Sequence, residues 1–287
     1  MNKDLRLSAS IFQKLVDVFN ENGWEISHDT SGLESRFNRF CERLSILDTK
    51  EQQLVIDLTR RFTNIGGEKY LSLIIKLLNR IHAEEKRNFF TAKKYFILPL
   101  VAPQDFNRTK SSSVVWYYFR DEQVKYNPLF AEKELVHCDI TKAAWTKNLK
   151  KDEVIVLVDD YVGSGETAIG AINWFKDSFK TDPKQIAILS IAAQEAGIKN
   201  VLQETGVITY SYYHFSRGIS DFYTGAQRDS HLETMSGIED KLNVVAKERL
   251  GHNQSEALIS LIRTPNNTFP VFWKPKGKSQ SAPFLRD

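Results

Sequence analysis

Two adjacent acids stand directly before a glycine-rich turn in the segment 154–175, VIVLVDDYVGSGETAIGAINWF. Asp159 and Asp160 end an apolar run that is typical of a buried strand, and the turn Gly163–Thr167 leads into a helical pattern. Ligands of an open parallel sheet bind beyond the carboxyl ends of its strands. The spacing of these residues therefore predicts a ligand site where a strand meets a helix.

The turn has the chemistry to bind a phosphate. The first backbone N–H groups of a helix lack intrahelical partners and carry partial positive charge. Glycine lets the backbone approach an anion closely, and Ser164 and Thr167 add hydroxyl donors. Carboxylates only accept hydrogen bonds, so Asp159 and Asp160 suit the vicinal hydroxyls of a ribose, directly or through Mg²⁺.

The same segment closely resembles the ribose-phosphate motif of type I phosphoribosyltransferases. That motif is an apolar strand, two acids, two apolar residues, a small residue, Thr or Ser, Gly, any residue and Thr. Matching positions are Asp159, Asp160, Val162, Ser164, Gly165 and Thr167. Tyr161 and Gly163 depart from the motif, since one is bulkier than an aliphatic residue and the other lacks a side chain.

This resemblance implies that the two acids bind the ribose hydroxyls, with Mg²⁺ at the acids as a hypothesis, and that the turn binds the 5-phosphate. The turn residues are Gly163, Ser164, Gly165, Glu166 and Thr167. Other motifs fit less well. A Walker A loop needs a lysine that the turn lacks, and a haloacid dehalogenase motif needs an acid at Tyr161. A strand–turn–helix connection whose acids only cap the helix is the alternative without a ligand.

Features over most of the chain resemble a divergent phosphoribosyltransferase-like domain of bacterial conflict and defence systems, including some retron-associated effectors. These features are DDYVGSGET at 159–167, Lys110-Ser111-Ser112, Arg217 to Asp221, and TPNNT at 264–268 followed by FPVFW. The resemblance implies an effector in anti-phage defence, with protein partners from the defence system and an associated nucleic acid. The TPNNT segment favours a fixed turn. Its alternative is closure over the pocket, with Trp273 stacked on a base.

Two basic residues are further candidates for catalysis. Transfer from phosphoribosyl pyrophosphate releases pyrophosphate, which magnesium and basic side chains stabilise. Arg108 and Lys110 lie in the loop 102–112, after the first predicted strand. We therefore interpret both as candidate catalytic residues beside Asp159 and Asp160, with solvated surface as the alternative for the two cations.

Hydrophobic periodicity predicts helices first and then a parallel sheet. Five apolar or β-branched runs are predicted strands. They are 94–101, 112–119, 153–160, 185–194 and 207–215. Helical patterns follow the third and fourth runs, so we expect an α/β fold with a parallel doubly wound sheet. The resemblance makes it a sheet of the type I phosphoribosyltransferase kind.

Three regions are predicted along the chain. Residues 1–90 form a helical N-terminal region, 91–225 the α/β core, and 226–287 a helical extension and TPNNT tail packed on the core. Within the extension we expect helices at 229–251, ending at Gly251, and at 255–263.

The connection between the first two strands is short for a crossover helix, which needs about 10–12 residues or more. This weakens the case for an enzyme, since type I enzymes form their pyrophosphate loop there.

Composition is that of an ordinary globular protein. The 287 residues are 41% hydrophobic and 26% charged, and a net charge of +3 is too small to indicate nucleic-acid binding by itself. Cys41 and Cys138 have no CxxC spacing, which excludes a cysteine zinc site and fits a reducing cytoplasm. Without a signal-peptide pattern or a long apolar run, we expect a cytoplasmic protein that does not enter a membrane.

Two functions fit these patterns. One is an enzyme with Mg²⁺-dependent chemistry at C1 of phosphoribosyl pyrophosphate or a related nucleotide. The other is a catalytically silent module that senses such a ligand or acts as a scaffold for protein or nucleic-acid partners. Binding needs only the turn and the two acids, whereas catalysis also needs residues that stabilise the leaving group.

Overall fold

The computed structural model describes residues 7–26, 35–84, 88–138, 149–276, 282–284 and 286. The chain forms two compact units. One unit spans 65–215, and the other combines 1–64 with 216–287. The first unit is therefore an insertion between two segments of the second. These boundaries differ from the ranges expected from sequence, 1–90, 91–225 and 226–287, because the helix at 70–84 packs with the sheet.

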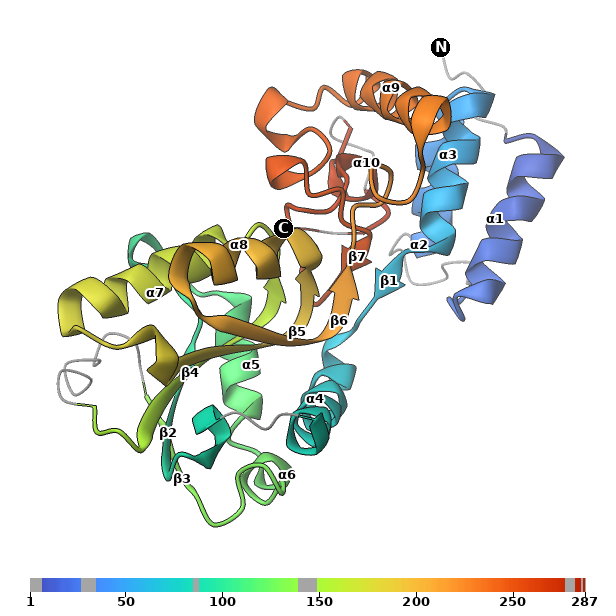
Figure 1. The fold of residues 1–287 in the computed structure, drawn as a ribbon. Helices are drawn as coiled ribbons and strands as arrows, with labels where there is room; N and C mark the ends of the chain where they lie inside the picture. Colours follow the sequence, from blue (N-terminus) through green and yellow to red (C-terminus); the bar gives the residue numbers. More distant parts are fainter. Residues whose placement is uncertain are drawn as a thin grey trace. The chain divides into compact units, whose positions relative to one another are not determined.

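A five-stranded parallel sheet forms the centre of the 65–215 unit (Figure 1). Its strands are β2 (Lys94–Pro99), β3 (Glu134–His137), β4 (Glu153–Val162), β5 (Ile186–Gln194) and β6 (Ile208–Phe215). Their order across the sheet is β3-β2-β4-β5-β6, and every neighbouring pair is parallel. The α/β class with a parallel sheet is thus confirmed.

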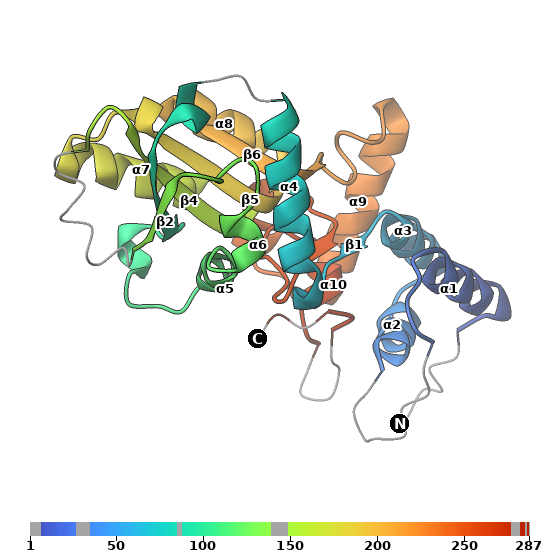
Figure 2. The same ribbon diagram turned by 90° about the horizontal axis from the view of Figure 1, so that it is seen from below.

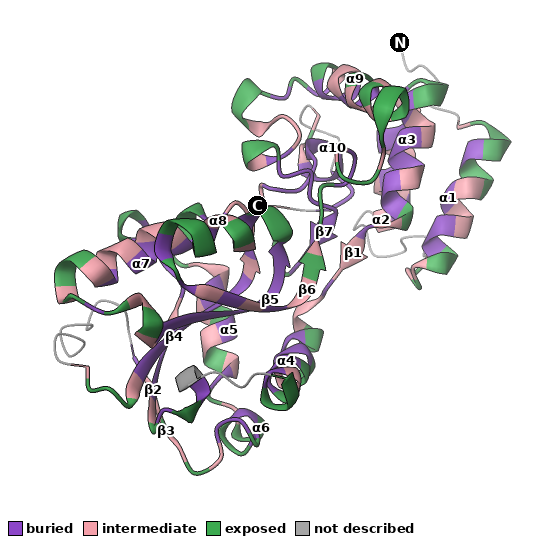
Figure 3. Cartoon of the chain, viewed as in Figure 1, coloured by how far each residue is buried: buried purple, intermediate pink, exposed green. Residues whose placement is uncertain are grey.

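Helices cover both faces of this sheet, as Figures 1 and 2 show. The described α-helices of this unit are α4 (Tyr70–Glu84), α5 (Ser111–Tyr118), α6 (Glu122–Lys125), α7 (Glu166–Phe179) and α8 (Glu195–Thr205). One face is covered by α4 and α5, and the other by α7 and α8. Because β4 and β5 are covered on both sides, they are buried almost throughout (Figure 3), and their sequences are nearly continuous apolar runs.

None of the helices in the described ranges has the length and apolar character to span a membrane.

The predicted strand at 112–119 is wrong, because most of this segment forms α5. Its β-branched and aromatic residues favour a strand locally, but Ser112, Val115 and Phe119 are buried at helical spacing. The short connection expected between the first two strands is therefore absent from the fold. The strand that follows β2 in the chain is β3, and α5 and α6 lie between them.

The second unit gathers helices from both ends of the chain. Its described α-helices are α1 (Ala9–Glu21), α2 (Arg36–Ser45), α3 (Thr49–Arg60), α9 (Gly225–Lys241) and α10 (Pro270–Trp273). Two short strands, β1 (Thr63–Asn64) and β7 (Ile259–Ser260), pair in parallel. One apolar core joins both segments, with Phe19 and Phe40 from the first, and Met235 and Phe272 from the second.

Two helix predictions in the C-terminal segment are wrong. The helix predicted to end at Gly251 stops at Lys241, and β7 lies inside the predicted helix 255–263. Gly251 has φ +78°, and a Cβ there would lie 2.0 Å from the carbonyl oxygen of Asn267. This glycine therefore permits close backbone contact with the TPNNT turn and does not end a helix.

The TPNNT segment is held by hydrogen bonds within its own unit. Thr268 Oγ1 donates to Ile259 O at 2.6 Å, and Asn267 Nδ2 donates to Ser255 Oγ at 2.7 Å. Trp273 is 6% exposed and donates from Nε1 to Thr268 O at 2.7 Å. These contacts match the interpretation as a fixed turn, since the buried indole presents no open ring face for a base.

A capping box at the start of α3 gives a stability test. Asp48 Oδ1 accepts from Glu51 N at 3.0 Å, and Glu51 Oε2 accepts from Asp48 N at 2.8 Å. We expect Asp48→Ala to lower the free energy of unfolding by about 1 kcal/mol in urea denaturation. The Glu51 N–H, followed by Lys241, lowers the pKa of Asp48. Its contribution is therefore present above about pH 4 and lost as the pH falls through the lowered pKa.

The control for this test is Asp177→Ala. It removes an exposed acid from the last turn of α7, where a negative charge opposes the helix dipole. This variant should be as stable as the wild type or more so. Equal losses in both variants, or no loss in Asp48→Ala, would contradict a stabilising role for the cap.

Candidate functional site

The acid pair lies where the strand order of the sheet reverses. From β2 the chain moves outward to β3, and it then returns to β4 on the other side of β2. Asp159 and Asp160 lie in the carboxyl-terminal part of β4, beside this reversal. Ligands of open parallel sheets bind in the crevice at such a point. The structure therefore brings the acid pair to the expected edge of the sheet.

Asp160 is held by two other elements. It is 4% exposed, and its Oδ2 accepts a hydrogen bond from the Tyr70 hydroxyl on α4 at 3.0 Å. Its Oδ1 accepts one from Ser111 Oγ at the start of α5 at 2.7 Å. Tyr70 was expected only as part of the N-terminal helical region, and its contact with Asp160 was not predicted. No local pattern indicates a contact between residues 90 positions apart.

Asp159 lies in a different environment. It is 9% exposed, and its Oδ1 accepts from the backbone N–H of Asp160 at 2.9 Å. Burial, followed by the charge of Asp160, raises the pKa of Asp159 well above its usual value, and the charge of Lys110 acts in the opposite direction. Its register partner on β5 is Ser190, whose buried hydroxyl has no hydrogen-bond partner among the described residues. Ser190 is a second polar residue here that the sequence analysis missed.

The turn after β4 presents the start of α7. Gly165 has φ +86° and occupies the N-cap position, where no side chain caps the helix. Ser164 Oγ accepts weakly from Glu166 N at 3.5 Å, and Glu166 and Thr167 are exposed. Together with Gly163, these residues form a turn whose backbone N–H groups and hydroxyls have the chemistry for an anion.

Close contact with α8 fixes this turn. A Cβ on Gly197 of α8 would lie 1.9 Å from the carbonyl oxygen of Gly163, so only glycine fits there. A Cβ on Gly165 would lie 2.9 Å from Gly197 O and from Val201 Cγ2. Asn200 Nδ2 also donates to Ser164 O at 3.0 Å. Gly165 was expected to permit anion access, and in the structure it also has left-handed backbone and lies in contact with α8.

The two predicted cations share one carboxylate. Lys110 Nζ lies 2.8 Å from Asp105 Oδ2, and Arg108 Nη1 lies 3.2 Å from Asp105 Oδ1. The Asp105 side chain is only 12% exposed, whereas that of Arg108 is 73% exposed. Phe106 packs its ring on Trp174 of α7, with 4.9 Å between centroids. The loop is thus anchored to the helix that follows the turn, and Asp105 is a charged residue that sequence reasoning missed.

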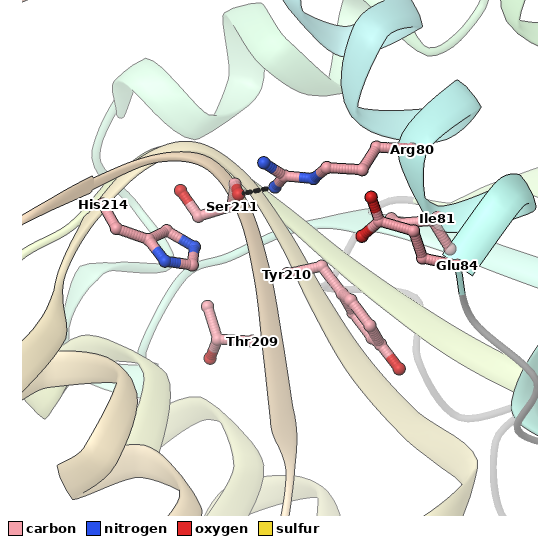
Figure 4. A pocket seen from close by; sticks show the side chains of 7 residues that line it. All are labelled: Arg80, Ile81, Glu84, Thr209, Tyr210, Ser211 and His214. Atoms are coloured by element: carbon pink, nitrogen blue, oxygen red, sulfur yellow. Dashed lines mark hydrogen bonds between the residues drawn. The ribbon is translucent and has the colours of Figure 1, made fainter.

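A separate open pocket of about 570 Å³ lies between α4 and β6 (Figure 4). It is lined by Arg80, Glu84, Tyr210 and His214 among others, and by none of the predicted site residues. Arg80 donates to the backbone carbonyls of Ser211 and residue 212, so its guanidinium group already has partners. The pocket is therefore distinct from the candidate site, and Arg80 anchors the far end of α4 to the sheet edge.

The acid pair alone is a sparse metal site. Within the described ranges, no group of three or more His, Cys, Asp or Glu side chains is placed to hold a metal ion. Mg²⁺ is usually bound through one or two carboxylates together with substrate phosphates and water. Asp159 and Asp160 fit such a shared site only with a phosphate-bearing ligand, so Mg²⁺ here is a hypothesis tied to that ligand.

Comparison with known proteins matches a family model to most of the chain. The model of the PRTase-CE family, whose prefix abbreviates phosphoribosyltransferase, matches residues 38–284. Among solved structures, the chain is similar to orotate phosphoribosyltransferase from Aeropyrum pernix, with 13% identity and a TM-score of 0.29. That alignment covers 60% of this chain and 75% of the other. No curated protein matches the chain.

The contact between α8 and the turn can be tested with Gly197→Ala. The added methyl group would overlap a backbone carbonyl at 1.9 Å, which no rotamer change relieves, so the turn must move. We expect a lower melting temperature and faster hydrogen–deuterium exchange of the amides at 163–167. The matched control is Gly237→Ala in α9, where the nearest atom to the new Cβ is Glu51 Oε1 at 3.4 Å. Unchanged exchange in Gly197→Ala would show that α8 does not fix the turn.

Proposed function

The chain belongs to the PRTase-CE family, and from this premise we propose that it binds a ligand containing ribose 5-phosphate, such as phosphoribosyl pyrophosphate or a nucleotide. The observation that carries the proposal is one arrangement at the reversal of strand order. There, two buried carboxylates on β4 precede a glycine turn at the start of α7. The carboxylates suit vicinal hydroxyls, and the glycine turn suits a phosphate.

Each part of the site has a distinct role in this proposal. The backbone N–H groups from Gly163 to Thr167, with the Ser164 and Thr167 hydroxyls, bind the 5-phosphate. Asp159 and Asp160 accept hydrogen bonds from the ribose hydroxyls, and Ser190 lies beside Asp159 with a hydroxyl that has no partner among the described residues. When bound with the ligand, Mg²⁺ at the acid pair would neutralise part of the charge on the diphosphate.

We further propose glycosyl transfer as the reaction. The bond between ribose C1 and the pyrophosphate oxygen breaks, pyrophosphate leaves with the bonding electron pair, and a nucleophile forms the new bond to C1. Lys110 and Arg108 would stabilise the departing charge, since their loop follows β2, the neighbour of β4. The charge of Lys110 lowers the pKa of Asp159, which supports a position of Lys110 close to the acid pair.

One observation favours the catalytically silent alternative. Asp105 pairs with both Lys110 and Arg108, so the two cations already face a carboxylate that competes with pyrophosphate. A domain that only senses a ribose phosphate, or acts as a scaffold for partners, needs no leaving-group residues. The two functions therefore differ in whether the loop cations leave Asp105.

The cellular role is also a proposal. The resemblance of DDYVGSGET and the TPNNT segment to domains of bacterial conflict systems supports an effector in anti-phage defence. Such an effector would act in the cytoplasm with defence-system proteins or an associated nucleic acid as partners. We expect a strain that carries Asp159→Asn to lose phage protection while the protein level stays unchanged. Retained protection would show that the defence role does not depend on this site.

Ligand binding can be tested with Asp159→Asn. We expect affinity for ribose 5-phosphate or phosphoribosyl pyrophosphate, measured by calorimetry with Mg²⁺, to fall about 10- to 100-fold, because a charged acceptor is lost. The melting temperature should not fall, since a neutral amide replaces a carboxylate whose pKa burial has raised. Asp152→Asn, an exposed acid just before the other end of β4, is the control. Equal affinity in Asp159→Asn and the wild type would refute the assignment.

Transfer and sensing can be separated with an Arg108→Ala, Lys110→Ala double variant. If these cations act on the leaving group, pyrophosphate release should slow by about 10²–10³-fold, while ribose 5-phosphate affinity stays within a few-fold. Lys176→Ala, in the last turn of α7, is the control. Wild-type release in the double variant would exclude this loop as the leaving-group site, and no release from the wild type would favour the silent alternative.

A further inference from the structure

The two acids of the site are held in different ways. Asp160 accepts a side-chain hydrogen bond on each carboxylate oxygen, from Tyr70 and from Ser111. Asp159 instead accepts a hydrogen bond from the backbone N–H of Asp160. From this difference we infer that Tyr70, with Ser111, is a positioning residue that fixes the Asp160 carboxylate for the ligand. The inference rests on the proposed function and extends the site to α4.

The chemistry of α4 supports a specific role for Tyr70. Its other buried residues are all aliphatic: Leu73, Ile74, Leu77, Leu78 and Ile81. Tyr70 is the one buried residue of this helix with a polar side chain, and it is 0% exposed. A phenylalanine would fill the same space without the cost of burying a hydroxyl. The hydroxyl therefore has a use beyond packing, since it donates to Asp160 Oδ2.

The surrounding structure fixes where the Tyr70 hydroxyl lies. Just before α4, the carbonyl of Gly67 accepts from the Tyr118 hydroxyl of α5 at 3.2 Å. Near the other end of α4, Arg80 donates to the backbone of β6 (Figure 4). A helix held at both ends keeps Tyr70 in one place, so the orientation of the Asp160 carboxylate is set before a ligand arrives.

Positioning leaves Asp160 able to bind. Two carboxylate oxygens offer about four lone-pair sites, and Tyr70 and Ser111 occupy one on each oxygen. The remaining sites have a fixed direction and suit a ribose hydroxyl or a metal ion. Preorganisation of this kind improves affinity because the carboxylate loses less conformational freedom on binding. Asp160 is therefore the rigid acceptor of the pair.

The test compares Tyr70→Phe and Ser111→Ala with Tyr95→Phe. Tyr95 is equally buried at 0% exposed, lies on β2, and has its hydroxyl near Lys133 and not near Asp160. We expect ribose 5-phosphate affinity, measured with Mg²⁺, to fall about 5- to 30-fold in the first two variants and to stay unchanged in Tyr95→Phe. In an Asp160→Asn background, the effect of Tyr70→Phe should vanish, because the two residues act through one carboxylate.

A second measurement needs no ligand. The side-chain carboxyl ¹³C resonance of Asp160 at neutral pH should move in Tyr70→Phe and Ser111→Ala but stay in place in Tyr95→Phe. Movement of this resonance supports positioning even if the wild type binds no ribose 5-phosphate, and that result would refute only the proposed function. An unmoved resonance, wild-type affinity in both variants, or an undiminished Tyr70→Phe effect in Asp160→Asn would overturn the inference.

Discussion

Two adjacent carboxylates buried in one strand are the constraint on which the rest of the site depends. A carboxylate removed from water needs hydrogen-bond donors or a nearby cation, and otherwise it becomes neutral. Asp160 obtains donors from α4 and α5, while Asp159 has a backbone N–H and the nearby charge of Lys110. The placement of two helices and one loop is therefore tied to this pair of acids.

The two faces of the sheet contribute different parts of the site. Helices α4 and α5 fix the carboxylate of Asp160. On the other face, α8 holds the turn through Gly197 and Asn200, and α7 presents its first N–H groups. A sugar phosphate has a hydroxyl end and an anionic end, so a site built from two separately held halves can recognise both at a fixed spacing.

Short-range patterns in the sequence predicted the features that depend on residues close together in the chain. The apolar runs of β4 and β5 and the glycine turn before α7 each depend on residues within a few positions. The strand predicted at 112–119 was wrong because β-branched content competed with burial on one helical face. Tyr70, Asn200 and the Gly197–Gly163 approach depend on chain segments that meet only after folding, and no spacing rule indicates them.

The insertion of 65–215 into the other unit has a consequence for synthesis on the ribosome. Helices α1 to α3 emerge before the C-terminal part of their unit, yet the core they share includes Met235 and Phe272, and β1 pairs with β7. Synthesis adds about 5–20 residues per second, so roughly 10–40 s pass between the emergence of the N-terminal helices and that of these partners. The nascent chain therefore exposes an incomplete apolar surface while the inserted sheet already has every residue of its own core. Chaperones that shield apolar surfaces could bind helices α1 to α3 during this interval.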